Sequence, residues 1–250
     1  MTDAELQGRI ALVTGGTGGI GSAICARLAE SGARVVSTYR DEAKVRGWQR
    51  SMRERGFDCE VYPCDVSSTE ACDGLAQQVS DQVGPVDVLV NNAGLTRDAT
   101  LKKMSAQQWR EVIAANLDSV FNMTRPLVTA MAERGWGRVV NISSVNGQKG
   151  QFGQVNYSAA KAGMHGFTMA LAQEVARKGV TVNTVSPGYI ATDMVMAVPG
   201  EVRAQIVAQI PVGRLGEPED VAHVVAFLVS PRAGFITGAN IAANGGQHMM

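Results

Sequence analysis

The sequence predicts a doubly wound α/β fold, in which one parallel sheet is covered by helices on both faces. Short β-rich runs alternate with longer segments of helical periodicity along the whole chain, as a parallel sheet with crossover helices requires. Several of the short runs are solid Val, Leu and Ile, as expected for strands buried on both sides. The chain has 250 residues, 45% of them hydrophobic, which suits one core and a single domain over residues 1–250.

The strands are predicted from short apolar runs bounded by turn residues. We expect about seven of them, at residues 9–14, 34–39, 58–63, 86–91, 137–142, 181–186 and 240–243. Each interval between successive runs is long enough for the crossover that joins two parallel strands.

The helices are predicted in those intervals. We expect them at residues 20–31, 42–56, 68–83, 105–134, 154–178 and 217–229. Ser105 with Gln108 forms a capping-box pattern, and Pro218 suits the first turn of the last helix. Residues 187–216 are the one long stretch with little regular pattern, and they carry several glycines and prolines. We expect this stretch to form a lid over an active site.

Charge and cysteine content argue against several classes of protein. Lys plus Arg balance Asp plus Glu at 23 each, so no charge excess indicates a nucleic acid or a polyanionic membrane as partner. The polar N-terminus lacks a signal core, and no apolar run approaches the length of a membrane span. The cysteines Cys25, Cys59, Cys64 and Cys72 show no C-x-x-C spacing. We therefore expect reduced thiols in a cytoplasmic protein, with neither disulfides nor a metal.

A glycine-rich turn joins the first predicted strand to the first predicted helix. It has the sequence Thr14-Gly-Gly-Thr-Gly-Gly-Ile-Gly21. Glycines in such a turn let the backbone approach a pyrophosphate, whose charge is favoured by the helix N-terminus. The spacing of Gly15, Gly19 and Gly21 departs from the usual G-x-G-x-x-G. The prediction of nucleotide binding therefore depends on the position of the turn between strand and helix.

The end of the second predicted strand indicates which dinucleotide binds. A carboxylate there would hold the ribose 2′-hydroxyl of NAD, whereas an arginine suits a 2′-phosphate. The strand ends Ser37-Thr38-Tyr39-Arg40, and the first carboxylate is Asp41. Arg40 can pair with a phosphate, and Ser37 or Thr38 can add hydroxyl bonds, which favours NADPH. In the alternative, Arg40 is an ordinary surface arginine and Asp41 binds the ribose.

Ser144, Tyr157 and Lys161 carry the groups needed to move a proton to or from an oxygen beside a bound cofactor. Tyr157 and Lys161 are spaced Y-x-x-x-K, thirteen residues after Ser144. Residues four apart share a helix face, so we expect Lys161 to lie against Tyr157. Lowering the pKa of a tyrosine from ~10 by roughly three units takes about 4 kcal/mol. A close ammonium is the expected source. In the alternative, the two residues are merely an exposed helical pair.

These motifs, taken in order, resemble the short-chain dehydrogenase/reductase family over essentially the whole chain. The set comprises the glycine spacing, Asp65-Val66, Asn91-Asn92-Ala93-Gly94, Asn116, Ser144, Tyr157, Lys161 and Pro187-Gly188. The resemblance implies a Rossmann-type sheet. It also implies that Tyr157 is the general acid in reduction and that Lys161 lowers the tyrosine pKa and binds the nicotinamide ribose. Ser144 would bind the substrate carbonyl, and Asn116 would hold a water in a proton relay.

The resemblance also implies a set of cofactor-binding residues. Asp65 and Val66 would hold the adenine, and Ile190 and Thr192 would contact the nicotinamide carboxamide. The full expected set is Gly15, Gly19, Ile20, Gly21, Arg40, Asp65, Val66, Asn92, Ala93, Gly94, Tyr157, Lys161, Pro187, Gly188, Ile190 and Thr192.

Within that family, residues 96–98, 141–154, 182–193 and 244–249 resemble bacterial enzymes that reduce acetoacetyl-CoA. By this likeness the acyl-thioester pocket would be lined by Asp98, Lys103, Gln151, Phe152, Gln154 and Tyr189. The implied reaction is the NADPH-dependent reduction of acetoacetyl-CoA, or a related short β-ketoacyl thioester, to (R)-3-hydroxybutanoyl-CoA. That product supplies monomer for polyhydroxybutyrate. Family members usually pair broad apolar helices across subunits, so the resemblance also implies a homotetramer.

Other functions are weighed against this one. A 3-oxoacyl-[acyl-carrier-protein] reductase of fatty-acid synthesis is the near alternative, with Arg134, Arg138, Arg177 and Lys178 as a patch for the acidic carrier. A non-catalytic NADP-sensing module is disfavoured because such relatives commonly lose the tyrosine or the lysine. A lyase or epimerase with the same triad is typically longer at its C-terminus.

Some residues could be mistaken for site residues. We expect His165 to be a packed helix histidine, because it shows no acidic partner in the sequence. Trp109, Trp136, Met164 and Met169 are expected in the core or at subunit contacts.

Overall fold

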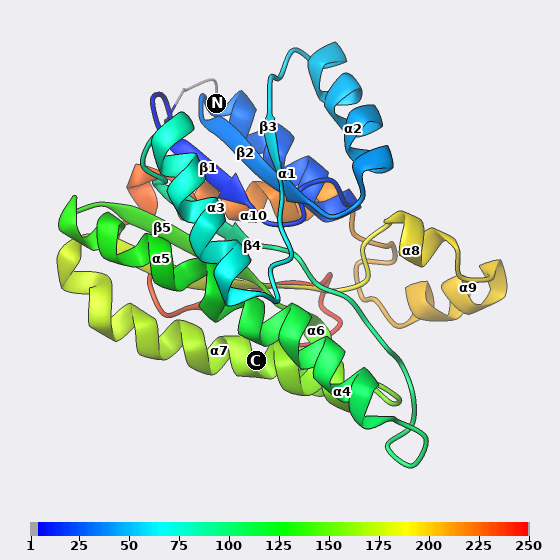
Figure 1. The fold of residues 1–250 in the computed structure, drawn as a ribbon. Coiled ribbons are helices and arrows are strands. Elements are labelled where there is room, and N and C mark those ends of the chain that lie inside the picture. Colours follow the sequence, from blue (N-terminus) through cyan, green and yellow to red (C-terminus); the bar gives the residue numbers. More distant parts are fainter. Residues whose placement is uncertain (1–4, 250) are drawn as a thin grey trace.

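The computed structural model describes residues 5–249 of the chain. Its strands are β1 (Ile10–Val13), β2 (Arg34–Tyr39), β3 (Glu60–Pro63), β4 (Val88–Asn91), β5 (Gly137–Ile142), β6 (Val180–Pro187) and β7 (Asn240–Ala243). Within these residues they form one sheet of seven strands in the order β3-β2-β1-β4-β5-β6-β7, and every neighbouring pair is parallel. The predicted α/β fold is confirmed (Figure 1).

Helices cover both faces of this sheet, α1 and α10 on one face and α3, α5 and α7 on the other. The α-helices are α1 (Gly19–Glu30), α2 (Glu42–Glu54), α3 (Thr69–Gln82), α4 (Ala106–Ile113), α5 (Ser119–Glu133), α6 (Val145–Lys149), α7 (Val155–Val175), α8 (Asp193–Met196), α9 (Gly200–Ala208) and α10 (Pro218–Val229). The predicted capping box is present at the start of α4, where Ser105 and Gln108 exchange hydrogen bonds with each other's backbone N–H. Pro218 occupies the first turn of α10, as expected.

The sheet separates two apolar cores. On one face, Ile24 and Leu28 of α1 pack with Val225 and Leu228 of α10. On the other face, the core is built from α3, α5 and α7 against the same strands. Strand order reverses between β1 and β4, and such a reversal in an open α/β sheet leaves a crevice beyond the carboxyl ends of the strands.

The predicted helix at 105–134 is not one regular helix. A π turn, Ala114–Asp118, separates α4 from α5. Asn116 lies in this turn, and its Nδ2 donates to the carbonyl of Val112, four residues earlier, at 2.9 Å. The side chain thereby takes an acceptor that a regular helix would give to a backbone N–H.

The predicted lid, 187–216, is also more regular than expected, because it contains α8 and α9. Both helices project at the end of the sheet, in yellow in Figure 1. None of residues 200–208 in α9 is buried, so no apolar stripe marks that helix in the sequence. Helix α6, only five residues long, also escaped prediction, and the third strand begins at Glu60, later than expected.

Candidate active site

A groove of about 560 Å³ lies at the point where the strand order reverses. Many of the expected cofactor residues line it: Gly15, Gly19, Ile20, Gly21, Arg40, Asp65, Val66, Asn92, Ala93, Gly94, Tyr157 and Thr192. Residues outside the predicted set also line it: Thr17, Gly18, Thr38, Tyr39, Asp41, Lys44, Cys64, Ala115 and Asp193. Most of these flank a predicted residue in the sequence, which is the signal that could have identified them.

The glycine turn forms one wall of the groove by packing tightly on the segment after β4. The Asn92 amide donates to the carbonyls of Thr14 and Gly15 at 3.0 Å each. A Cβ on Gly21 would collide with the Gly15 carbonyl and lie 2.7 Å from Asn92 Nδ2. The residue before α1 is Gly18, which has no side chain to cap the first N–H groups of that helix. These donors fit the pyrophosphate of a dinucleotide.

The end of β2 presents cationic side chains to the groove. Arg40 and Lys44 both line it. Asp41 Oδ1 accepts hydrogen bonds from the backbone N–H groups of Ala43 and Lys44, at 3.0 and 3.3 Å, and so caps α2. The carboxylate that would bind a ribose hydroxyl is therefore engaged in holding the helix.

The two hydroxyl residues beside Arg40 do not act as expected. Ser37 is completely buried, and a Cβ on Gly16 would collide with its Oγ. The predicted contribution of Ser37 to phosphate binding is therefore wrong, because its hydroxyl faces the interior of the protein. Thr38 lines the groove, but its hydroxyl accepts the Gly15 N–H at 2.9 Å. This hydroxyl supports the glycine turn.

Tyr157, in the first turn of α7, reaches into the groove from the side of β5. Ser144, the residue that caps α6, lies close enough to this phenol to act on its pKa. Burial raises the pKa of Tyr157 to about 12, the Ser144 hydroxyl opposes that rise, and the nearby Asp98 carboxylate adds to it. The phenol is therefore protonated at neutral pH, the form that a general acid requires.

Lys161 lies behind this tyrosine and does not itself line the groove. It is 3% exposed, its Nζ donates to the Ile142 carbonyl at 2.7 Å, and it lies 5.5 Å from the centre of the Tyr157 ring. Burial lowers the pKa of Lys161 to about 7. The sequence predicted that the ammonium lowers the pKa of Tyr157. In this structure Lys161 is not among the groups that act on the pKa of Tyr157, and desolvation dominates the pKa of both residues.

Asn116 supplies an unpaired acceptor close to this lysine. Its Nδ2 donates to Leu95 and Val112, whereas its Oδ1 is buried and has no hydrogen-bond partner within residues 5–249. A Cβ on Gly94 would collide with that Oδ1 and lie 3.6 Å from Lys161 Nζ. The glycine thus preserves a space between the amide oxygen and the amine, and a buried acceptor in such a space is suited to an ordered water.

The expected substrate residues are only partly brought together. Gln154 Nε2 donates to Asp98 Oδ2 at 2.8 Å across the mouth of the site. Phe152 is 86% exposed, Lys103 is exposed, and Gln151 is half-buried. Asp98 is close enough to raise the pKa of Tyr189 beyond the effect of burial.

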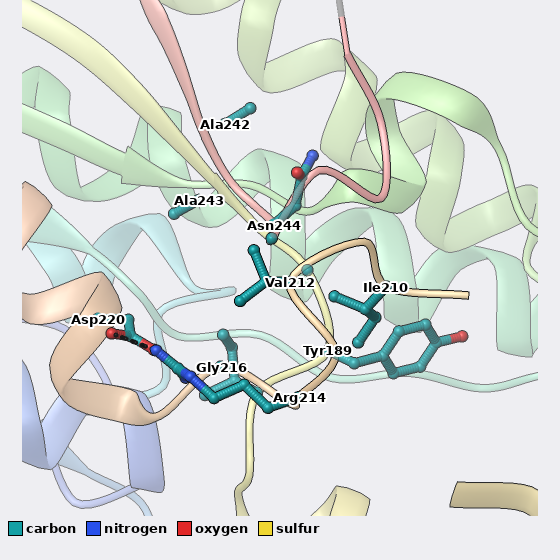
Figure 2. A pocket seen from close by; sticks show the side chains of 12 residues that line it. Tyr189, Ile210, Val212, Arg214, Gly216, Asp220, Ala242, Ala243 and Asn244 are labelled. Atoms are coloured by element: carbon teal, nitrogen blue, oxygen red, sulfur yellow. Dashed lines mark hydrogen bonds and ion pairs between the residues drawn. The ribbon is translucent and has the colours of Figure 1, made fainter. Parts of the chain in front are cut away.

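Figure 2 shows a second cavity, of about 280 Å³, beside the ends of β6 and β7. Gly188, Tyr189 and Ile190 line it, and its Arg214 and Asp220 side chains pair with each other at 2.7 Å. Three of the expected cofactor residues, Pro187, Gly188 and Ile190, are not among the residues that line the groove. Gly188 packs against Asn244 and Ile190 forms a bridge with Gly216, so both are directed to the base of the lid.

The predicted carrier-protein patch is not a free basic surface. Arg138 is 4% exposed and its guanidinium lies 4.5 Å from the centre of the Trp136 ring. Arg134 donates to the Val86 carbonyl and pairs with Asp87. Arg177 and Lys178 are exposed. Because Arg138 is buried, the four predicted cations do not form one exposed basic surface.

Several remaining residues can now be placed. His165 Nε2 lies 3.0 Å from Ser143 Oγ, and burial lowers the pKa of His165. Met164 is fully buried, whereas Trp109 and Met169 are 39% and 53% exposed. The four cysteines are buried and free. Among residues 5–249 no helix has the length and apolar composition to cross a membrane, and no cluster of three or more His, Cys, Asp or Glu is placed to bind a metal.

Comparisons with known proteins agree with this geometry. A family model described as enoyl-(acyl carrier protein) reductase matches residues 15–248. An acetoacetyl-CoA reductase of Rhizobium meliloti is 58% identical over 243 residues, covering 96% of this chain and 98% of that protein. One from Cupriavidus necator is 57% identical over 242 residues, with 96% and 98% covered. A 3-oxoacyl-[acyl-carrier-protein] reductase of Vibrio cholerae is 43% identical over 246 residues, with 98% and 100% covered.

Proposed function

This chain belongs to the short-chain dehydrogenase/reductase family, and from that premise we propose that it is an NADPH-dependent acetoacetyl-CoA reductase. Its product is (R)-3-hydroxybutanoyl-CoA, the monomer of polyhydroxybutyrate. The observation that carries the proposal is that Tyr157, with Ser144 close by, lines the same groove as the glycine turn and Arg40. Relatives that are acetoacetyl-CoA reductases by name match nearly the whole chain.

The cofactor is a nicotinamide dinucleotide, and we assign NADPH from the end of β2. Arg40 and Lys44 give this part of the groove positive charge, which suits a 2′-phosphate. Asp41 Oδ1 accepts both cap bonds of α2, so the carboxylate that could bind the ribose hydroxyl of NADH is partly engaged.

NADPH, when bound, supplies a hydride to the ketone carbon. Negative charge then develops on the carbonyl oxygen, and two hydroxyl donors aimed at that oxygen stabilise it. Tyr157 gives its phenolic proton to the oxygen, and Ser144 donates a hydrogen bond to it. Lys161 is fixed beside Tyr157 by its bond to the Ile142 carbonyl. After the transfer, a proton returns to the phenol through the space between Lys161 Nζ and Asn116 Oδ1.

The near alternative, reduction of a carrier-protein thioester, has weaker support. A carrier protein needs an exposed basic surface for its acidic helices. Arg138, a central member of the predicted patch, is buried against Trp136. A CoA thioester needs no such protein surface, which favours acetoacetyl-CoA as substrate.

The proposal includes a homotetramer that works in the cytoplasm. Trp109, Phe121 and Met169, on α4, α5 and α7, are exposed apolar side chains, and such side chains favour burial against a second copy of the chain. Light scattering of the purified protein should give four times the chain mass. A monomer mass would contradict this part of the proposal.

Steady-state assays test the function directly. Purified protein with NADPH should consume acetoacetyl-CoA far faster than the matched thioester of acyl-carrier protein. The measurement is the loss of nicotinamide absorbance at equal thioester concentrations. Failure to consume acetoacetyl-CoA would overturn the proposal, and faster turnover of the carrier-protein thioester would favour the alternative.

A further inference from the structure

A series of hydrogen bonds, which passes through the backbone and the side chain of Asn146, joins Ser144 to the carboxylate of Asp98. Ser144 Oγ accepts the backbone N–H of Asn146 at 3.1 Å. Asn146 Nδ2 donates to Gln154 Oε1 at 3.0 Å, and Gln154 Nε2 donates to Asp98 Oδ2 at 2.8 Å. The chain joins the segment after β4, the cap of α6 and the residue before α7.

The Asp98 carboxylate fixes the direction of the two side-chain bonds in this series. An ionised carboxylate can only accept, so Gln154 must turn its NH₂ toward Asp98 and its oxygen toward Asn146. Asn146 then has to present its own NH₂ to Gln154. The backbone N–H of Asn146 occupies one lone pair of Ser144 Oγ in the cap of α6, and the bond from its side chain to Gln154 restrains the same residue. The Ser144 proton remains for donation toward the reacting oxygen.

The side chain of Asn146 is not needed to hold the two loops together. The Ala99 N–H donates to the Gly153 carbonyl at 2.9 Å, and Asn156 Nδ2 donates to the Arg97 carbonyl at 3.1 Å. These bonds join the segment after β4 to the start of α7 independently of Asn146. Loss of the Asn146 amide should therefore release Gln154 without separating the loops.

Asn146 also carries an energetic cost that packing alone does not explain. It is 8% exposed, and its Oδ1 is buried with no hydrogen-bond partner within residues 5–249. A buried polar atom without a partner is destabilising. An apolar residue of similar volume would avoid that cost but would lose the donor to Gln154.

We propose that Asn146 is a positioning residue, which acts through Gln154 and Asp98 to aim the Ser144 hydroxyl at the substrate carbonyl. The inference deepens the proposed function and rests on it for the identity of the substrate. Burial and then Ser144 and Asp98 act on the pKa of Tyr157, so both ends of the chain lie close to the proton donor.

The test is a double-variant cycle with Asn146→Ala and Gln154→Ala, assayed with NADPH and acetoacetyl-CoA. Asn146→Ala should lower kcat about 10-fold, because misdirecting an oxyanion donor costs less than removing it. The KM for NADPH should be unchanged. In the Gln154→Ala background the same substitution should have almost no further effect on kcat. If Asn146 acted independently of Gln154, the two losses would multiply.

The matched control is Gln148→Ala on the same short helix. Gln148 also has a buried Oε1 without a partner in the described chain, yet it lies outside the chain of hydrogen bonds. It should leave kcat unchanged. If Asn146→Ala does not bind NADPH, the same cycle with Asn146→Asp, which keeps the volume and removes the donor, decides the question.

Three outcomes overturn the inference: wild-type kcat in Asn146→Ala, multiplied losses in the double variant, or an equal loss in Gln148→Ala. Failure of the proposed function has a different readout, since the wild type would then leave acetoacetyl-CoA intact. In that case ethyl acetoacetate serves as the ketone for the cycle, and the ratios among the variants still decide the role of Asn146.

Discussion

Gly94 lies against the amide oxygen of Asn116 so closely that a side chain between them is excluded. A Cβ on Gly94 would collide with Asn116 Oδ1 and lie 3.6 Å from Lys161 Nζ. Asn116 Oδ1 is a buried acceptor with no partner in residues 5–249. Because Gly94 has no side chain, the space between Asn116 Oδ1 and Lys161 Nζ stays open for the proposed transfer of a proton back to Tyr157.

Gly94→Ala should impair catalysis, because the methyl group displaces either the Asn116 amide or Lys161. We expect kcat to fall by roughly 10²-fold, the scale on which misplacement of a catalytic group acts. The measurement is steady-state turnover of acetoacetyl-CoA. Gly74→Ala on α3 is the control, since its Cβ would meet no atom of residues 5–249 within 4 Å. Wild-type kcat in Gly94→Ala would contradict this role.

Cofactor preference should depend on Arg40 and not on Asp41. Arg40→Ala should raise the KM for NADPH roughly 10–100-fold, the value of a charge-assisted hydrogen bond of about 1.5–3 kcal/mol, with little effect on NADH. Asp41→Asn keeps an oxygen for the cap on α2 and should change neither KM. The measurement is kcat/KM for both cofactors. A selective loss of NADH turnover in Asp41→Asn would instead make Asp41 the ribose ligand.

The buried amine of Lys161 should make the free energy of unfolding depend on pH. Its pKa is about 7 in the fold against 10.5 for the free group. Between these values the unfolded chain binds more protons, so the free energy of unfolding rises with pH, by at most about 1.4 kcal/mol per pH unit. Below about pH 7 both states are protonated and the cost of burial is present in full.

Lys161→Met should remove this dependence. Urea denaturation at pH 7.5 and 9 should show a smaller gain in the free energy of unfolding for the variant than for the wild type. The difference in slope isolates Lys161, because the thiols and phenols titrate in both proteins. Equal slopes would mean that the buried amine keeps its ordinary pKa.

Asp98 should extend the reductase activity to higher pH. The phenol must be protonated to act as acid, so the reductive rate falls as pH rises through the pKa of Tyr157. Asp98 contributes to raising that pKa, after burial, and Asp98→Asn should therefore move the loss of activity to lower pH. Asp193→Asn, at a carboxylate that lines the groove but does not act on the pKa of Tyr157, is the control. An unchanged pH profile for Asp98→Asn would show that its charge does not act on the tyrosine.

Much of the fold could be predicted because parallel strands and crossover helices have distinct periodicities. The apolar runs located β1, β2 and β4–β7 to within a few residues. The π turn at Ala114–Asp118 could not be found in this way, because its cause is the Asn116 side chain bonding to Val112. Helix α9 buries none of residues 200–208, so it has no apolar pattern to detect.

The site was predicted where the sequence carries a backbone or charge requirement. The glycine turn, Arg40 and Asp65 line the groove as expected. The direction of a side chain is set by tertiary packing, and the sequence does not contain it locally. For this reason the sequence left Ser37 and Thr38 as alternative hydroxyls for the cofactor phosphate, although Ser37 is buried. Ile190 likewise turns to the base of the lid, where it bridges to Gly216.

The most direct test of the account is single-turnover oxidation of bound NADPH by acetoacetyl-CoA in the wild type and in Tyr157→Phe. The variant keeps the aromatic ring in the groove but has no proton to give, so NADPH should bind with unchanged affinity. Hydride transfer should slow by roughly 10²–10⁴-fold, the range for loss of a general acid. Transfer at the wild-type rate in Tyr157→Phe would contradict the assignment of that phenol as the proton donor.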